Sequence, residues 1–239
     1  VQITNILDKI FPEFKPFFFI NLSSTALFIL SKYKKPSRIA RWSNKDIQDI
    51  HNFSRRIPMF KFVKLKELAK NTVGNENQYL ISLLQSILNI YNTLDAEVSS
   101  LDSQITEIMK QYDSPIASIQ GISLISAASL IGEFGDISKF DNPNQMLAYA
   151  GLEPSRAQSG TTDFKGHMVK HGSGHLRYVL FNLVPVLCLH NPIFYSYYIK
   201  KRNEGKSYRV TQSHVIKKLI RVIYRLETTD TLFDSNLLR

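Results

Sequence analysis

One series of apolar residues at heptad spacing constrains the fold of this chain more than any other feature. Its members lie alternately four and three residues apart: Leu80, Leu84, Ile87, Tyr91, Leu94, Val98, Leu101, Ile105 and Ile108. This spacing places them on one face of a long helix and is typical of a coiled-coil seam. Such a helix packs along its own domain or forms an arm that pairs with a partner helix. We favour the arm, and therefore expect a homo-oligomer that forms through the coiled coil.

Helical periods and caps account for most of the remaining chain. Ser43 or Asn44 is positioned to cap one helix, Asp141 or Asn142 another, and Asn191-Pro192 opens a third that Gly205 ends. Strand alternation does not run far anywhere, apart from a short ribbon that residues 151–177 allow. The sequence therefore predicts a mainly α protein, in which long coiled-coil helices precede a compact helical domain.

We divide the chain into three segments. Residues 1–57 are interpreted as the remnant of an upstream domain with linker helices, because the first helical pattern begins without a cap or an initiator Met. Residues 58–113 form the coiled-coil helices, and residues 114–239 the C-terminal domain. Ser114-Pro115 marks the boundary between the last two segments, because proline at that place stops the long helix.

Residues 116–140 are similar to a helix-hairpin-helix unit. A turn at Gln120 to Ser123 precedes a helix with the small residues Ala127 and Ala128. In that motif the glycine turn and the free N–H groups of the next helix hold a DNA phosphate without reading its sequence. Gly121 and Ser123 are therefore candidate DNA-binding residues. The motif usually has a second glycine where Ser123 stands, and a helix pair packed through its alanines explains the pattern equally well.

No helical or strand period explains residues 151–177, which contain five glycines and three histidines. A loop of this length inside a compact chain is usually functional or disordered. Glycines allow a backbone to approach a ligand closely, and cations suit a polyanion. The segment has four Lys and Arg residues, Arg156, Lys165, Lys170 and Arg177, and only two acidic residues, Glu153 and Asp163. The alternative is a flexible basic loop on the surface.

The positive charge is concentrated in the same half of the chain. The formal net charge is +10, whereas the segment from Pro154 to Arg225 has 13 Lys and Arg residues against Asp163 and Glu204. Such a basic segment is typical of nucleic-acid binders, although an anionic membrane surface attracts it too. We favour nucleic acid, because the basic helices have tyrosines and polar residues rather than a wide apolar face.

Several classes of protein are excluded by what the sequence lacks. Cys188 is the only cysteine, so the chain has no disulfide framework and no cysteine-based metal site. His167, His171 and His175 recur every four residues, but Gly172 and Gly174 lie between them, so we expect no shared helix face and no metal site. Residues 17–30 are apolar but too short to span a membrane. We expect a cytoplasmic protein without a membrane segment.

Residues 116–226 resemble a known family through a series of motifs in a fixed order. These are GEFGDISKF, AYAGLEPS, QSG, GHMVKHGSGHLR and KKLIRVIYRL. This order is similar to the C-terminal domain of the bridge-RNA-guided DEDD transposases, the IS one-ten group of bacterial insertion sequences. Earlier in the chain, NILDKIFPEF looks like the end of the RuvC-like domain of that family, and SKYKKPSRIARWS like its linker to the coiled coil.

The resemblance implies a bacterial, nucleoid-associated transposase or recombinase, with DNA and a structured guide RNA as partners. By family position the serine nucleophile is Ser159, in Gln158-Ser159-Gly160. Judged by residue type and the basic loop alone, Ser155 and Ser173 are similarly good candidates for the nucleophile. Our candidate nucleic-acid-binding residues are Gly121, Ser123, Arg156, Gly160, Lys165, Lys170, His171, Arg177 and Lys218.

The resemblance also implies a magnesium site that this chain does not complete. In the family four acidic residues of the RuvC-like domain hold Mg²⁺, and we expect them upstream of Val1, since no carboxylate cluster here replaces them. We therefore expect no cofactor in this chain, Mg²⁺ with the RuvC-like domain, and a chain that is inactive without it. The alternative function is a non-catalytic, truncated nucleic-acid-binding protein.

Overall fold

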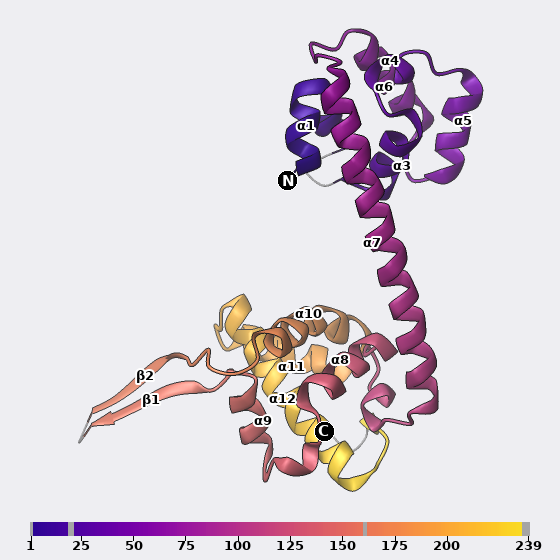
Figure 1. The fold of residues 1–239 in the computed structure, drawn as a ribbon. Coiled ribbons are helices and arrows are strands. Elements are labelled where there is room, and N and C mark those ends of the chain that lie inside the picture. The colour runs from indigo at the N-terminus through magenta and orange to yellow at the C-terminus, as the bar shows by residue number, and fades with distance from the viewer. Residues whose placement is uncertain (1, 19–21, 160–161, 236–239) are drawn as a thin grey trace. The chain divides into compact units, whose positions relative to one another are not determined.

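The structure is a computed structural model that describes residues 2–18, 22–159 and 162–235; for residues 154–159 and 162–167 it describes the backbone only. Helices dominate the described chain, which confirms the predicted mainly α fold (Figure 1). The chain divides into two compact units, Val1–Ser99 and Ser100–Arg239, hereafter unit 1 and unit 2. The three segments drawn from the sequence stay a prediction.

Unit 1 consists of short helices around one apolar core. They are α1 (Gln2–Ile10), α2 (Phe14–Phe17), α3 (Ser24–Tyr33), α4 (Pro36–Ile39), α5 (Asn44–Phe53), α6 (Met59–Lys70) and the first part of α7 (Gln78–Gln111). Within the apolar stretch 17–30, Ala26, Ile29 and Leu30 are buried in this core. Their burial explains the apolar run without a membrane.

A capping box and a close glycine contact shape the chain in unit 1. Ser43 and Asp46 form a capping box at the start of α5, since the Ser43 hydroxyl accepts from the Asp46 N–H at 3.2 Å and the Asp46 carboxylate accepts from the Ser43 N–H at 2.9 Å. Between α6 and α7, a Cβ on Gly74 would lie 2.2 Å from the Ile10 carbonyl oxygen. The chain therefore passes α1 at a distance that only glycine permits.

The heptad seam lies on α7, a single helix of 34 residues. Leu84 is buried in the core of unit 1, and Ile105 packs against the core of unit 2. Ile87 also packs against the core of unit 1, whereas the next four seam residues are exposed: Tyr91, Leu94 (60% accessible to solvent), Val98 and Leu101 (54%). The long helix is confirmed, whereas the pairing of its seam in a coiled coil stays a prediction.

Unit 2 has a core formed mainly by three of its helices, α8, α10 and α12. Its elements are η1 (Pro115–Ser118), α8 (Leu124–Phe134), η2 (Ile137–Lys139), α9 (Pro143–Tyr149), β1 (Pro154–Ser159), β2 (Thr162–Met168), α10 (Gly174–His190), α11 (Pro192–Asn203) and α12 (Tyr208–Thr229). The caps predicted at Asn142 and Asn191 are confirmed on α9 and α11, and Ser173 caps α10.

The predicted helix-hairpin-helix unit is not confirmed. Where that motif has its first helix, η1 is one 3₁₀ turn of four residues. Gly121 has a φ of +97°, and a Cβ there would lie 3.0 Å from the Leu187 Cα, so the turn packs closely on α10. The Ser123 hydroxyl accepts from the Ser126 N–H at 3.2 Å and caps α8. The glycine at this turn is thus explained by helix packing.

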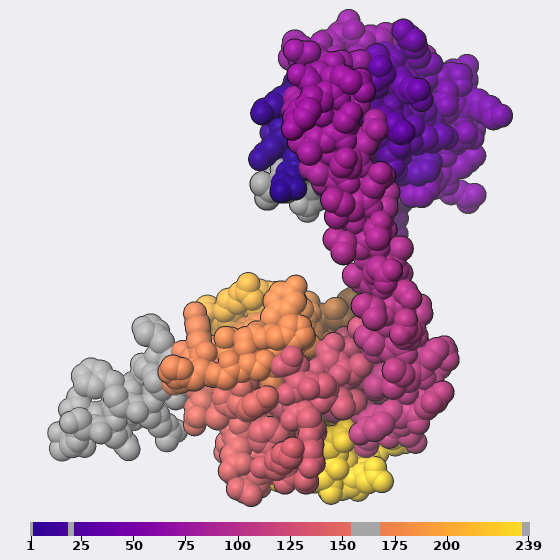
Figure 2. Space-filling view, in the orientation of Figure 1, coloured from indigo at the N-terminus to yellow at the C-terminus, as the bar shows by residue number. Residues whose placement is uncertain are grey.

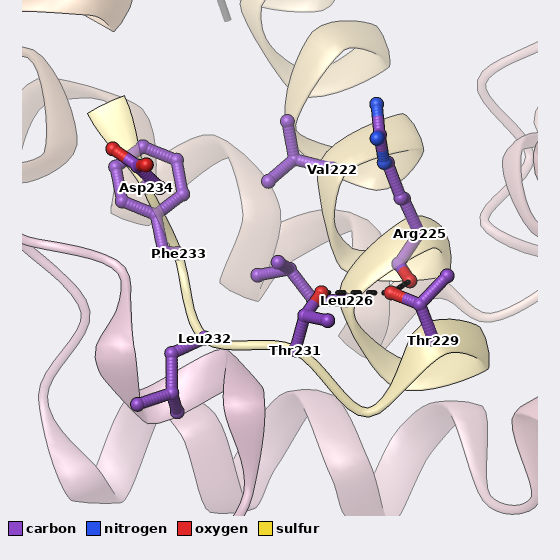
Figure 3. Close-up of a pocket in the computed structure, with 8 residues that line it drawn as sticks. All are labelled: Val222, Arg225, Leu226, Thr229, Thr231, Leu232, Phe233 and Asp234. Carbon is purple, nitrogen blue, oxygen red and sulfur yellow. Dashed lines mark hydrogen bonds between the residues drawn. The ribbon is translucent and has the colours of Figure 1, made fainter. Parts of the chain in front are cut away.

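The segment after α12 packs back onto unit 2. The Phe233 N–H donates to the Ser118 hydroxyl at 2.8 Å, and the Phe233 ring stacks on Phe194 with ring centres 6.4 Å apart. A hollow of about 200 Å³ lies between this segment and the end of α12 (Figure 3). Its lining is mostly apolar, with Val222, Leu226 and Phe233 among its side chains. This hollow belongs to the packing of the C-terminal segment.

Among the described helices, none is by itself both long and apolar enough to cross a membrane. Helices α10 and α11 together have the length and composition of a membrane span, but the pair is bent by 108°.

Candidate nucleic-acid interface

A two-stranded antiparallel hairpin occupies the centre of the predicted basic loop, and confirms the short ribbon that the sequence allowed there. It extends away from the helices of unit 2 (Figure 1). Its register pairs Arg156 with Lys165 and ends at the pair Ser159 and Thr162. Ser159 is therefore the last residue of β1, while Gly160 lies outside the described residues. The side chains of Ser159, Arg156 and Lys165 also lie outside the described part of the structure.

Two glycines hold the two ends of this loop together. A Cβ on Gly172 would lie 2.1 Å from the Tyr149 carbonyl oxygen, and one on Gly151 would lie 2.3 Å from the His171 carbonyl oxygen. Both glycines have positive φ, +104° and +64°. The sequence suggested that the loop glycines admit a ligand. At these two positions the close approach is instead to the chain itself, which fixes the base of the hairpin.

Arg177 ties α10 to the same base. The residue is half-buried, and its Nη1 donates to the Ala150 carbonyl oxygen at 3.0 Å. One donor is used in this way, and the other N–H groups of the guanidinium can bind a second partner. His171 and Lys170 lie in the preceding segment, and both are exposed.

Ser173 has its hydroxyl engaged on both sides. It donates to a carboxylate oxygen of Glu133 at 2.6 Å and accepts from the Leu176 N–H at 3.0 Å. The other Glu133 oxygen lies 2.7 Å from His175 Nδ1. The Ser173 hydrogen bond, followed by that of His175, lowers the pKa of Glu133. In the space-filling view, the start of α10 (orange) lies against the rose-coloured part of unit 2 that precedes the hairpin in sequence (Figure 2).

A basic groove lies at the base of the hairpin, where the end of β2 meets α10 and the start of α12. Its volume is about 720 Å³. We call it the hairpin groove. The side chains that define its chemistry are Lys170, Arg177, Tyr178, Phe181, Asn182 and Arg209. Of the predicted residues, the structure brings Lys170 and Arg177 together here. Gly121, Ser123, His171 and Lys218 do not line this groove.

Four residues of the hairpin groove were missed by sequence reasoning: Tyr178, Phe181, Asn182 and Arg209. Tyr178 and Asn182 are four residues apart on a strongly apolar helix, so their spacing on one exposed face was a signal that could have been used. Arg209 offered no such signal, because its place in the groove depends on how α12 packs against α10.

Lys218 lies elsewhere in unit 2, over two aromatic rings. Its ammonium is 5.0 Å from the centre of the Tyr197 ring and 5.8 Å from that of Phe194. Burial lowers the pKa of Lys218. Its stem therefore contributes to packing between α11 and α12, and its charge is held by cation–π contacts.

Within the described residues, no three His, Cys, Asp or Glu side chains gather in a way that could hold a metal ion.

Comparison with known proteins finds a family match in the segment that contains the hairpin. Residues 113–199 match the family described as Transposase IS116/IS110/IS902. This stretch is therefore similar to the transposase domain of that family. It includes Ser159, the whole hairpin, α10 and five of the six named residues of the hairpin groove.

Curated relatives agree with this assignment. The Insertion element IS110 uncharacterized 43.6 kDa protein of Streptomyces coelicolor is 24% identical over 158 residues, which are 65% of this chain and 39% of that protein. The Insertion element IS116 uncharacterized 44.8 kDa protein of Streptomyces clavuligerus is 18% identical, over 97% of this chain and 59% of that protein. The Pilin gene-inverting protein of Moraxella bovis is 25% identical, over 59% and 46%. The chain thus spans less than two thirds of the length of each of these relatives.

Proposed function

We propose that this chain provides the DNA-joining domain of a transposase or recombinase of insertion elements. The observation that supports this most strongly is the family match over residues 113–199, because it covers the hairpin on which Ser159 lies. Relatives named for insertion elements and for inversion of a pilin gene support a reaction that rearranges DNA. Such a protein acts at bacterial DNA, so we place it in the cytoplasm at the nucleoid.

In this proposal Ser159 is the nucleophile. Its hydroxyl oxygen forms a bond to the phosphorus of a DNA phosphodiester, the bond from phosphorus to one sugar oxygen breaks, and that oxygen takes up a proton. The resulting phosphoserine ester retains the energy of the phosphodiester for rejoining. Ser159 is the last residue of β1, in a hairpin that extends from the domain, a position that suits contact with a large substrate.

The structure weakens the claim of one competing serine. The Ser173 hydroxyl is bound to both Glu133 and the Leu176 N–H, so a role as nucleophile would require it to abandon an N-cap. Ser155, whose side chain is not among those described, keeps its claim on residue type. Family position favours Ser159 over both.

The proposed reaction needs groups beyond those that the described residues supply. Serine is a weak nucleophile unless a base or a metal activates it. The described residues offer no metal-binding cluster. We therefore propose that Mg²⁺ is held by a separate RuvC-like domain, that a structured guide RNA selects the DNA, and that this chain does not join DNA without them.

We also propose that a second copy of this chain pairs along α7. The seam residues Tyr91, Leu94, Val98 and Leu101 are exposed and continue the heptad register of buried residues on the same helix. An apolar stripe at this spacing is stabilised when another helix covers it. Two copies would bring two nucleophiles to one DNA exchange.

The test of the proposed function is a covalent adduct. The chain would be mixed with labelled DNA, a RuvC-like domain from a relative, Mg²⁺ and guide RNA, and denaturing gels would detect DNA bound to protein. We expect Ser159→Ala to abolish the adduct and keep DNA binding, and Ser155→Ala and Ser173→Ala to retain it. Mapping the attachment to any serine other than Ser159 would overturn the assignment, and an adduct formed by the chain without added components would overturn its dependence on them.

A further inference from the structure

The hairpin groove combines features that the proposed joining reaction does not itself require. It has the size of a pocket that holds a ligand of a few hundred daltons. It is open to solvent, and helix α10, on which most of its side chains lie, is fixed by buried leucines such as Leu176, Leu180 and Leu187. A site on a well-packed helix holds its side chains in place before a ligand arrives.

The charge of the groove indicates an anionic ligand. Lys170, Arg177 and Arg209 line it, and no carboxylate does among the described residues. None of the ion pairs in the described part of the chain involves any of these three cations. The Arg209 guanidinium lies 5.8 Å from the centre of the Phe181 ring, so the arginine is positioned without a carboxylate partner. A phosphate would satisfy the cations.

The exposed ring of Tyr178 indicates that the ligand has a planar group in addition to a phosphate. Tyr178 is 68% exposed although it lines the groove, and Asn182 lies one helical turn further along the same face of α10. A ring presented in this way offers a stacking surface for a planar group. The Asn182 amide has donors and an acceptor with which it can bind the edge of a base.

We propose that the hairpin groove binds an unpaired nucleotide, with its base stacked on Tyr178 and its phosphate bound by Lys170, Arg177 and Arg209. The inference deepens the proposed function, since strand exchange separates bases that were paired. A duplex keeps the faces of its bases stacked inside the helix and so does not offer them to Tyr178. Phosphate contacts from the cations would hold duplex and single strand alike, whereas stacking selects the single strand.

The test measures binding by fluorescence anisotropy with three labelled ligands of equal length: a deoxythymidine oligomer, a uridine oligomer and a DNA duplex. We expect Tyr178→Ala to weaken single-strand binding by roughly 5-fold or more, the range reported for loss of one base stack, and duplex binding by less than about 2-fold. Tyr178→Phe keeps the ring and should bind as the parent does. Tyr195→Ala, on α11 outside the groove, is the matched control, since Tyr195 is 52% exposed.

The two single strands separate the sources of the nucleotide. A loss confined to the deoxy oligomer assigns the groove to the exchanged DNA strand, a loss confined to the uridine oligomer assigns it to RNA, and a loss on both supports the shared chemistry. Equal losses on single strand and duplex, or no loss on either single strand, would overturn the proposal. Crosslinking of an iodouracil-containing oligomer to Tyr178 provides a second readout. Since none of these measurements uses Ser159, the joining proposal and the groove proposal can fail separately.

Discussion

The Ser173 hydroxyl donates a hydrogen bond to Glu133, with 2.6 Å between the two oxygens, across a sequence separation of 40 residues. Because the same hydroxyl caps α10, this contact joins the start of α10 to α8. The residues that follow on α10 include Arg177 and Tyr178, which line the hairpin groove. The position of the proposed binding site therefore depends on a hydrogen bond outside it.

Replacing Glu133 by Gln should change how stability depends on pH. The Ser173 hydrogen bond, followed by that of His175, lowers the pKa of Glu133 below its ordinary value of 4.5. A carboxylate with a lowered folded pKa stabilises the protein above the unfolded pKa, and this contribution is lost as the pH falls through the folded pKa. We expect Glu133→Gln to lower the unfolding temperature near neutral pH and the difference from the parent to shrink below about 4.5.

Thermal unfolding followed by far-UV circular dichroism at a series of pH values would measure this difference. Glu97→Gln, at an exposed position of α7, is the control and should follow the parent at every pH. Parallel curves for the parent and Glu133→Gln would show that the carboxylate has no special role in holding α10.

The features that could be predicted from the sequence are the local ones. The caps Asn142 and Asn191 accept hydrogen bonds from N–H groups two or three residues further along the chain, so the stretch that contains them is sufficient to recognise them. The long helix α7 follows in the same way from a spacing repeated along one segment. The position of Ser159 was expected from family resemblance, and its side chain lies outside the described residues.

The features that could not be predicted depend on contacts between distant segments. Gly172 lies against the carbonyl of Tyr149, and a glycine in a basic loop gives no indication of whether its neighbour is backbone or ligand. Arg209 joins Tyr178 in one groove because α12 packs on α10, a pairing that no local pattern specifies. Gly121 packs tightly against Leu187, and a glycine turn does not by itself distinguish such packing from a DNA-binding motif.

Nucleic-acid binding by the chain should weaken steeply with salt. On B-DNA the log–log slope of affinity against salt is about −0.9 for each phosphate neutralised. We expect Lys170→Gln and Arg209→Gln each to reduce the slope by about 1, because both cations lack a carboxylate partner in the described groove. Lys110→Gln is the control, since its ammonium already pairs with Glu107 at 2.7 Å. Affinities that do not change between low and moderate salt would contradict an electrostatic interface.

Charges in the α7 seam should prevent self-association. Leu94→Asp combined with Leu101→Asp places two carboxylates where a partner helix would have to bury them, and burial of an unpaired charge is costly. Sedimentation should show a shift towards the monomer, with the unit formed by residues 114–226 still folded. The control is Thr93→Asp combined with Ser100→Asp, which adds the same charges at the same spacing one position away from the seam. If both double variants sediment as the parent does, the seam is only a surface stripe.

Substitution of Gly172 by Ala should destabilise unit 2 more than the same substitution at Gly205. Both glycines have positive φ, +104° and +78°, so alanine is strained at either place by about 1–2 kcal/mol. At Gly205 a Cβ meets no atom within 4 Å, whereas at Gly172 it would lie 2.1 Å from the Tyr149 carbonyl oxygen, a backbone atom that cannot rotate away. Urea unfolding followed by circular dichroism should therefore show a larger loss of unfolding free energy for Gly172→Ala.

In the reconstituted joining reaction, Gly172→Ala should also reduce the Ser159 adduct, because relieving the clash opens the base of the hairpin. Gly205→Ala should leave the adduct unchanged. Equal losses of stability in the two variants, with the adduct intact in both, would mean that the hairpin does not depend on this contact for its position.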